Sequence, residues 1–378
     1  MIKEMSRMEL KSFIITLAVA LSAQAQEGKI YTTNDGVRFK VETVAANLEV
    51  PWSIAFDKAG NMYFTERPGR LSVLTNGEKQ PKLLGSIEGV VEQGEGGLMG
   101  LALHPEFEKN HWIYLSLTFR FKEALANTVV RYTLINGTLD ARKSIVKYLP
   151  GSAVHNGCRI RFGPDGKLYV TAGDAADRKI AQDIASLGGK ILRINDDGSV
   201  PGDNPDPKSP IFALGVRNPQ GIDWHPDNGM MFETEHGPSG FDGPGGGDEV
   251  NIIVAGANYG WPVIHHKESK EGMISPLLEY TPASAPAGAT FYSGKAFPAW
   301  KNNFFFGGLR GTRIQRVILD EKDPRKVKGE EALLLGEFGR IREVAQGPNG
   351  EVYFSTSNTS RGRPAVDDDR ILRIVPAR

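Results

Sequence analysis

The chain has 378 residues, and its 45 basic and 45 acidic side chains give a formal net charge of zero. Neither sign forms long blocks, so the sequence predicts no strong field that would attract nucleic acid or an anionic membrane. Cys158 is the only cysteine, which excludes an intramolecular disulfide. The expected partner is therefore a small molecule.

The first 25 residues have the pattern of a secretory signal peptide. Three basic residues precede an apolar stretch at residues 13–21, and small residues lie before an expected cleavage site at Gln26. The apolar stretch is too short to span a bilayer, and no later stretch is long enough. We expect a periplasmic or secreted protein with no membrane span, whose residues 26–378 form a single domain. An uncleaved anchor or a lipid attachment is the competing interpretation.

Six apolar or aromatic runs recur along the chain, at unequal spacings of roughly fifty to seventy residues. We expect them as inner strands: Met62-Tyr63-Phe64, Ile113-Tyr114-Leu115, Leu168-Tyr169-Val170, Met231-Phe232-Glu233, Phe304-Phe305-Phe306 and Val352-Tyr353-Phe354. Each is followed by a β-rich segment expected as an outer strand: residues 70–74, 129–134, 190–194, 250–254, 314–319 and 370–374.

Turn-forming pairs such as Asp165-Gly166 and Asn349-Gly350 stand before these runs. Six strand groups joined by Gly-rich turns predict an all-β fold, the six-bladed β-propeller, in which each blade packs on its neighbours. A β-sandwich or two smaller all-β domains is the alternative.

His155 and Asp174 are the first candidates for chemistry. In a propeller, His155 precedes an inner run and Asp174 follows it, so the two side chains would meet near one rim. A histidine held by a carboxylate is a good general base, because the acid fixes its tautomer and stabilises the imidazolium. A histidine that only caps a turn is the alternative.

Two further clusters carry polar groups between strands. Arg217-Asn218 offers directional donors suited to quinone or carboxylate oxygens, unless the arginine only caps strand ends. The segment from Glu235-His236-Gly237-Pro238 to Asp248-Glu249, with Tyr259 beyond it, is rich in glycine and oxygen ligands. Such a set suits a hard cation such as calcium, although most Gly-rich acidic loops bind nothing.

Arg340 and Arg342 are the last candidates. Alternate residues on a strand face the same side, so both would point one way while Ile341 packs away. Two guanidinium groups on one face repel unless they share an anion or carboxylates. The pattern therefore indicates either an acidic ligand or pairing with an acid on the next blade.

Together these motifs resemble the soluble glucose dehydrogenase and aldose sugar dehydrogenase family. The resemblance runs from about residue 48 to residue 374, and it is carried by an ordered set: Gly94-Glu95-Gly96-Gly97-Leu98-Met99-Gly100, His155-Asn156-Gly157, Gly173-Asp174, Arg217-Asn218-Pro219-Gln220-Gly221, Glu235-His236-Gly237-Pro238, Asp248-Glu249 and Asn258-Tyr259-Gly260-Trp261-Pro262. The family is known for six-bladed propellers that carry pyrroloquinoline quinone (PQQ) and calcium.

The resemblance implies oxidation of aldose sugars at the anomeric carbon to lactones, with electrons passing from PQQ to an external acceptor. His155 would take the proton of the anomeric hydroxyl, with Asp174 orienting it, while hydride passes to the C5 carbonyl carbon of the quinone. Arg217 would help to stabilise charge on the quinone oxygen.

The resemblance also assigns cofactor and metal contacts. Residues matched to the cofactor are Glu95, Arg217, Asn218, Arg310, Arg340 and Arg342, of which the last two would face its carboxylates. Carbonyls of Gly237 and Pro238 match those that hold a calcium acting on the quinone as a Lewis acid. Glu249 and the Tyr259 carbonyl match ligands of a separate structural calcium.

Three positions depart from the family pattern. Glu95 replaces a glutamine, and a carboxylate there would repel an anionic quinone unless it is paired or protonated. Cys158 replaces a glycine beside the base and would crowd the site. Ala283 replaces a threonine that touches the cofactor.

These departures keep two other functions open. One is a propeller that has lost redox chemistry and acts as a carbohydrate-binding or interaction module. The other is a metal-dependent lactone hydrolase, which would need a convergent cluster of side-chain metal ligands in the channel.

Overall fold

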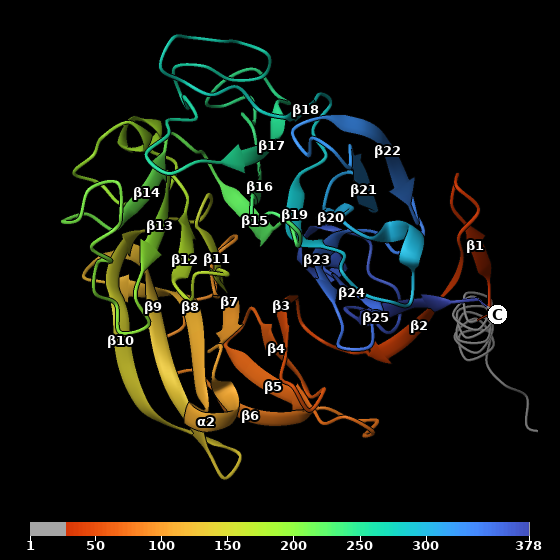
Figure 1. The fold of residues 1–378 in the computed structure, drawn as a ribbon. Coiled ribbons are helices and arrows are strands. Elements are labelled where there is room, and N and C mark those ends of the chain that lie inside the picture. The colour runs from red at the N-terminus through yellow and green to blue at the C-terminus, as the bar shows by residue number, and fades with distance from the viewer. Residues whose placement is uncertain (1–27, 378) are drawn as a thin grey trace, which may run out of the picture.

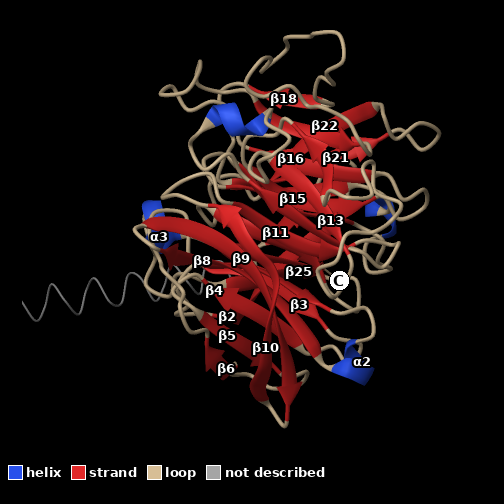
Figure 2. Cartoon of the chain, turned by 90° about the vertical axis from the view of Figure 1, so that its left-hand side faces the viewer, coloured by secondary structure: helices blue, strands red, loops and turns tan. Residues whose placement is uncertain are grey.

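The computed structural model describes residues 28–377, so the expected signal peptide, residues 1–25, lies outside the described residues. Six antiparallel sheets stand in a ring around a central axis (Figure 1). This arrangement confirms the six-bladed β-propeller. Figure 2 shows the ring from the side, where strands dominate and the helices are short. No helix within residues 28–377 is long and apolar enough to cross a membrane.

Each of the first five blades contains four strands in chain order. Blade 1 comprises β3 (Pro51–Phe56), β4 (Met62–Glu66), β5 (Arg70–Leu74) and β6 (Lys82–Ser86). Blade 2 comprises β7 (Leu98–Leu103), β8 (Trp112–Phe121), β9 (Ala124–Ile135) and β10 (Thr138–Pro150). Blade 3 comprises β11 (Gly157–Phe162), β12 (Leu168–Ala172), β13 (Lys190–Ile194) and β14 (Ile211–Leu214).

The remaining blades follow the same order. Blade 4 comprises β15 (Pro219–Trp224), β16 (Met231–Glu235), β17 (Asp248–Ile253) and β18 (Leu278–Tyr280). Blade 5 comprises β19 (Pro286–Phe291), β20 (Phe304–Gly308), β21 (Arg313–Leu319) and β22 (Val327–Leu333). Blade 6 comprises β23 (Ile341–Gln346), β24 (Val352–Thr356), β25 (Ile371–Pro376), β2 (Arg38–Ala45) and β1 (Ile30–Thr32). The short helices are α2 (Phe107–Asn110), α3 (Asn358–Arg361), and the 3₁₀ turns Arg178–Ala181 and Pro298–Trp300.

The two ends of the chain close the ring in blade 6. β2 pairs antiparallel with β25, with Val41 opposite Ile374, and Figure 1 shows red β2 beside blue β25. The last blade is thus completed by the first long strand, so the ring closes between strands far apart in the sequence.

The six apolar runs are not the innermost strands, and this part of the prediction was wrong. They are the second strands of their blades, and the segments expected as outer strands are the third. The innermost strands are β3, β7, β11, β15, β19 and β23, which contact one another around the axis. These strands carry polar or small residues such as Arg159, Gln220 and Gly288, because they line the channel and crowd its axis. They therefore lack the apolar signal that marks a strand buried on both faces.

The hydrophobic core is divided among the junctions between blades. Between blades 3 and 4, for example, Tyr169 and Ile191 pack with Ile222 and Met231, and comparable clusters fill the other five junctions. Each blade thus buries both faces against its neighbours, which is why each second strand contains an apolar run.

The turns that join the first and second strands form where the sequence predicts them. Gly166 and Gly350 have φ of 72° and 88°, a region that favours glycine, and the amide of each closes a turn to the carbonyl of Gly163 or Gly347. Since these turns lie at one end of the channel, the loops before first strands and after second strands gather at the other. That end carries the candidate residues.

Candidate active site

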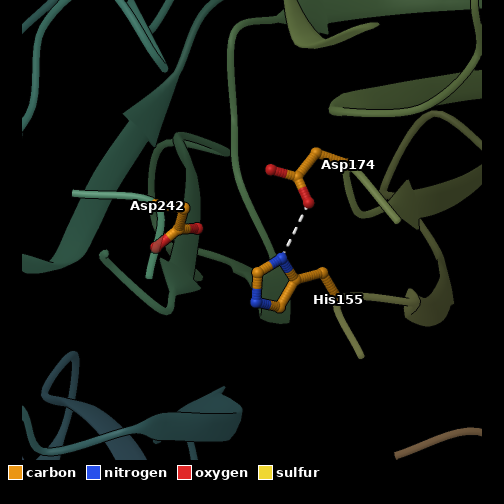
Figure 3. A group of neighbouring side chains, drawn as sticks. All are labelled: His155, Asp174 and Asp242. Atoms are coloured by element: carbon orange, nitrogen blue, oxygen red, sulfur yellow. Dashed lines mark hydrogen bonds and ion pairs between the residues drawn. The ribbon is translucent and has the colours of Figure 1, made fainter. Parts of the chain in front are cut away.

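His155 and Asp174 come together at this end of the channel (Figure 3). His155 precedes β11 and Asp174 follows β12, and Nδ1 lies 2.8 Å from Asp174 Oδ1. Their side chains are 5% and 1% exposed. A carboxylate only accepts hydrogen bonds, so Nδ1 carries the proton and Nε2 keeps a basic lone pair.

Other donors fix the carboxylate of Asp174. Trp261 Nε1 donates to Oδ2 at 2.9 Å, and the amide of Ala176 donates to Oδ1 at 2.9 Å. The Asp174 amide in turn donates to the Arg217 carbonyl. The carboxylate is therefore locked in place, and the imidazole that it holds has one orientation.

A cavity of about 280 Å³ opens beside this pair, with Asn156 and Gly157 in its wall. Five guanidinium groups also line it: Arg67, Arg310, Arg340, Arg342 and Arg361. The carboxylates in the same wall are Glu95 and Asp248. Arginine thus outnumbers acid around the cavity, which favours a ligand that carries negative charge.

Arg340 and Arg342 both face the cavity, whereas Ile341 packs into the core between blades 5 and 6. This is the alternation that the sequence predicts. Burial lowers the pKa of Arg342 to about 9, and the nearby Arg340 adds to that shift. The Nε atoms of both side chains are buried without a hydrogen-bond partner in the described chain. Their Nη1 atoms donate to uncharged oxygens, the Leu309 carbonyl and Gln220 Oε1. Because no carboxylate of the described residues forms an ion pair with either side chain, the arrangement favours an acidic ligand.

A chain of amides connects this arginine pair to the histidine loop. Arg342 Nη1 donates to Gln220 Oε1 at 3.0 Å, and Gln220 Nε2 donates to Asn218 Oδ1 at 2.9 Å. The same Asn218 oxygen accepts from the amide of Gly157. Asn218 Nδ2 is buried without a partner among the described residues. The NH₂ group of Asn218 is therefore uncommitted in the described chain, although Asn218 itself does not line the large cavity.

Arg217 does not line the large cavity, although its guanidinium contacts His236 and Ser239, which do. Its Nε donates to Asp242 Oδ2 at 2.8 Å, and its Nη1 donates to the His236 carbonyl at 3.0 Å. Its guanidinium is thus committed to the loop between β16 and β17. Figure 3 shows the Asp242 carboxylate beside the imidazole of His155.

Glu95 lies in the cavity wall as an ionised, partnered carboxylate. Burial raises its pKa, but His236, the backbone amide of His155 and Arg342 together bring that pKa below its ordinary value. The His155 amide donates to Glu95 Oε2 at 3.0 Å. Glu95 thus keeps its negative charge, which the nearby guanidinium of Arg342 offsets.

Cys158 does not crowd the cavity. Its side chain is fully buried against Trp52 and Met99. These two residues line the cavity, and Cys158 does not. The left-handed backbone of Cys158, with φ of 67°, explains why glycine would also fit there. Ala283, the third departure, does line the cavity, with a methyl group as its side chain.

The model of the Glucose / Sorbosone dehydrogenase family matches residues 48–364. The chain belongs to the glucose/sorbosone dehydrogenase family.

Curated relatives of this dehydrogenase family include two enzymes that span most of the chain. Aldose sugar dehydrogenase YliI of Escherichia coli is 31% identical over 345 residues, which cover 85% of this chain and 90% of the relative. Quinoprotein glucose dehydrogenase B of Acinetobacter calcoaceticus is 33% identical, with 89% of each chain covered. The PQQ-bound aldose sugar dehydrogenase of Streptomyces coelicolor superposes with a TM-score of 0.79 at 33% identity, covering 89% of this chain and 98% of that one.

The residues of this dehydrogenase family member that match metal ligands lie at two places. Gly237 and Pro238 line the large cavity. Glu249 and Tyr259 line a small cavity of about 10 Å³, which is the space of about one water or ion. Gly237 and Pro238 line this small cavity as well, so the two cavities share this part of their walls.

A cluster of buried glutamates lies at the small cavity. Glu235 on β16 lies opposite Glu249 on β17, and Glu233 lies two residues before Glu235 on β16, opposite Asn251. Asn251 Nδ2 donates to all three carboxylates, at 3.1 to 3.3 Å. Burial, with mutual repulsion, raises the pKa of Glu233 and Glu249, and burial raises that of Glu235 to about 7. An oxygen-rich set under this repulsion fits a hard cation.

Sequence reasoning missed several residues that the structure brings to this site. His236, Gln220 and Trp52 line the large cavity, and Trp261 and Asp242 hold Asp174 and Arg217. Gln220, His236 and Trp261 lie inside motifs already singled out, so those motifs marked the right segments. Asp242 lies in a loop of glycines and carried no signal of its own.

Proposed function

We propose that this protein is a PQQ- and calcium-dependent dehydrogenase that oxidises aldoses at the anomeric carbon to lactones. Electrons would pass to an external acceptor, and the protein would work in the periplasm or outside the cell. The observation that carries the proposal is the arginine-lined cavity, with unpartnered buried donors, beside a histidine held by a carboxylate. Membership of the glucose/sorbosone dehydrogenase family favours sugar oxidation as the reaction at this site.

The cavity fits a compact ligand with several carboxylates, as PQQ is. Arg340 and Arg342 line the cavity and would hold carboxylates through their guanidinium groups. Arg310 is exposed on the cavity wall and would add a third positive charge. Without an anion, the repulsion among these groups opposes their burial, so binding the cofactor would stabilise this end of the channel.

The proposed calcium ions occupy the two places described above. Carbonyls of Gly237 and Pro238 would hold one ion at the cofactor, and Glu249 with the Tyr259 carbonyl would hold the other. When bound, PQQ supplies an electrophilic quinone carbonyl that accepts the hydride from the sugar, and its calcium polarises that carbonyl.

His155 would act on the substrate from Nε2. The lone pair at this atom removes the proton of the anomeric hydroxyl, and Asp174 stabilises the imidazolium that forms. The hydrogen bond from Trp261 Nε1 would keep the Asp174 carboxylate in position during this transfer. Arg217 would stabilise charge at the cofactor only after leaving Asp242, because it holds the β16–β17 loop in the structure.

The test begins with purified mature protein stripped of metal by a chelator. We expect PQQ to bind saturably when calcium is restored, and the loaded protein to reduce a dye with aldoses. Absence of PQQ binding would contradict the proposal and favour the non-redox binding module. Binding without turnover on any aldose would show that the substrate class is wrong.

A further inference from the structure

The loop between β16 and β17 places an apolar ring, that of Phe241, against the proposed general base His155. The ring of Phe241 stacks on the imidazole of His155, with centroids 5.7 Å apart and planes 21° from parallel. Phe241 nevertheless remains 66% exposed, whereas His155 is 4% exposed. One face of the phenyl ring thus covers the base and much of the rest meets solvent.

Polar contacts of Asp242, the residue that follows Phe241, hold this part of the loop in place. Arg217 binds the Asp242 side chain through Nε and Nη2, at 2.8 and 2.7 Å. Arg178 donates to the Asp242 carbonyl at 3.0 Å, and Asp242 Oδ1 accepts from the amide of Ser239 at 2.9 Å. The residues next to Phe241 are therefore anchored to blades 3 and 4, although glycines surround them.

Core packing does not account for this placement. An exposed phenylalanine contributes little burial energy. A polar residue at position 241 would leave the loop equally well anchored, because Asp242 makes the anchoring contacts. A single exposed apolar residue is ordinary on a protein surface, so it is the stacking on the imidazole of His155 that distinguishes Phe241 from the others. Because the ring lies on the imidazole, it also borders the space from which a molecule would approach that imidazole.

We propose that Phe241 is a substrate-contacting residue, an aromatic platform that receives the C–H face of an aldopyranose ring beside His155. This inference rests on the proposed function. A pyranose carries hydroxyls around its rim and C–H bonds across its faces, so an aromatic ring binds one face while polar groups bind the rim. Asp242, through its ion pair with Arg217, positions the platform.

The experiment compares Phe241→Ala, Phe241→Tyr and Leu83→Ala. Leu83 is an exposed apolar residue on β6, the outermost strand of blade 1, and serves as the matched control. Each loaded protein is assayed for KM and kcat with aldoses and for PQQ affinity. Binding of a 1-deoxy aldose, which has no anomeric hydroxyl to oxidise, is measured by calorimetry.

We expect Phe241→Ala to raise both the KM and the Kd of the 1-deoxy sugar about three- to ten-fold, the range of one aromatic contact. Phe241→Tyr should restore both values, and PQQ affinity and Leu83→Ala should stay as in the original protein. Unchanged KM and Kd in Phe241→Ala would overturn the platform. A rise in kcat/KM would also overturn it, because the ring would then be an obstructing cover.

The calorimetric readout separates this inference from the proposed function. If the protein oxidises no aldose but loses 1-deoxy sugar binding in Phe241→Ala, the platform stands and the redox function fails. If the original protein binds no sugar by either measurement, the platform is overturned as well.

Discussion

Asp174 accepts a hydrogen bond from His155 Nδ1 at 2.8 Å, at a position where both side chains are buried. The carboxylate thereby selects the tautomer that leaves Nε2 free to take a proton. An asparagine could donate instead of accept, and would favour the tautomer with the proton on Nε2.

We therefore expect Asp174→Asn to lower kcat by about 10³- to 10⁴-fold, the scale seen when the same change is made in a serine-protease triad. PQQ affinity should change little. Trp261→Phe removes the bond to Oδ2 and keeps an aromatic ring, so it serves as the control, with a smaller loss of kcat expected. Turnover of Asp174→Asn at the original rate would show that the pair is structural.

The arginine pair gives a prediction about cofactor binding. Arg342→Met or Arg340→Met removes a charged donor whose Nε has no partner in the described residues. Each change should weaken PQQ binding by about 10- to 100-fold, since hydrogen bonds to charged groups contribute about 1.5–3 kcal/mol. Arg325→Met, at an exposed pair with Asp323, is the control. Equal PQQ affinity in all three variants, measured by titration, would show that Arg340 and Arg342 have only a structural role.

The buried glutamate cluster gives a prediction about metal removal. A cation at Glu235 and Glu249 would offset their repulsion, so a chelator should lower the Tm of the original protein by several degrees. Glu249→Gln relieves part of the repulsion and removes a charged ligand, so its Tm should respond less to the chelator.

Glu123→Gln, on the exposed end of the hairpin between β8 and β9, is the control for the loss of one acidic charge. It should keep the full response. A Tm that calcium and chelator leave unchanged in the original protein would contradict a structural cation at this cluster.

The acid dependence of stability should depend on Asp35. Arg316 Nη2 lies 2.7 Å from Asp35 Oδ2, which ties the chain between β1 and β2 to blade 5. The hydrogen bond from Arg316 lowers the pKa of Asp35 from 3.8 to about 2. A depressed carboxyl pKa contributes stability above the unfolded value, and that stability is lost as the pH falls from about 4 towards 2.

Asp35→Asn should therefore lower Tm near neutral pH and show a flatter decline of Tm between pH 4 and pH 2. Calorimetry of both proteins across this range measures the difference. Parallel Tm curves would show that the ion pair with Arg316 contributes nothing, as many exposed pairs do.

The sequence predicts the propeller well because strands buried on both faces leave an apolar signal, as Phe304-Phe305-Phe306 does. It fails for the innermost strands, because a strand such as Gly157–Phe162 faces the channel and carries Arg159, which breaks that signal. The closure of the ring by β2 and β25 is also invisible to local pattern, since it joins residues more than 300 positions apart.

The candidate site is predicted in part. His155, Asp174, Arg340 and Arg342 lie as their spacing indicates, because strand alternation and loop position follow from the fold. Arg217 faces the β16–β17 loop because Asp242 binds it, and a side-chain contact inside an irregular loop has no period that a sequence reveals.

The most direct test is a single-turnover measurement on the PQQ- and calcium-loaded protein, mixed rapidly with an aldose deuterated at C1. We predict that the cofactor absorbance changes at a rate that shows a primary isotope effect. His155→Gln should bind the cofactor and leave that absorbance unchanged. Reduction of the cofactor by His155→Gln at the original rate, or no isotope effect when chemistry limits the rate, would contradict the account.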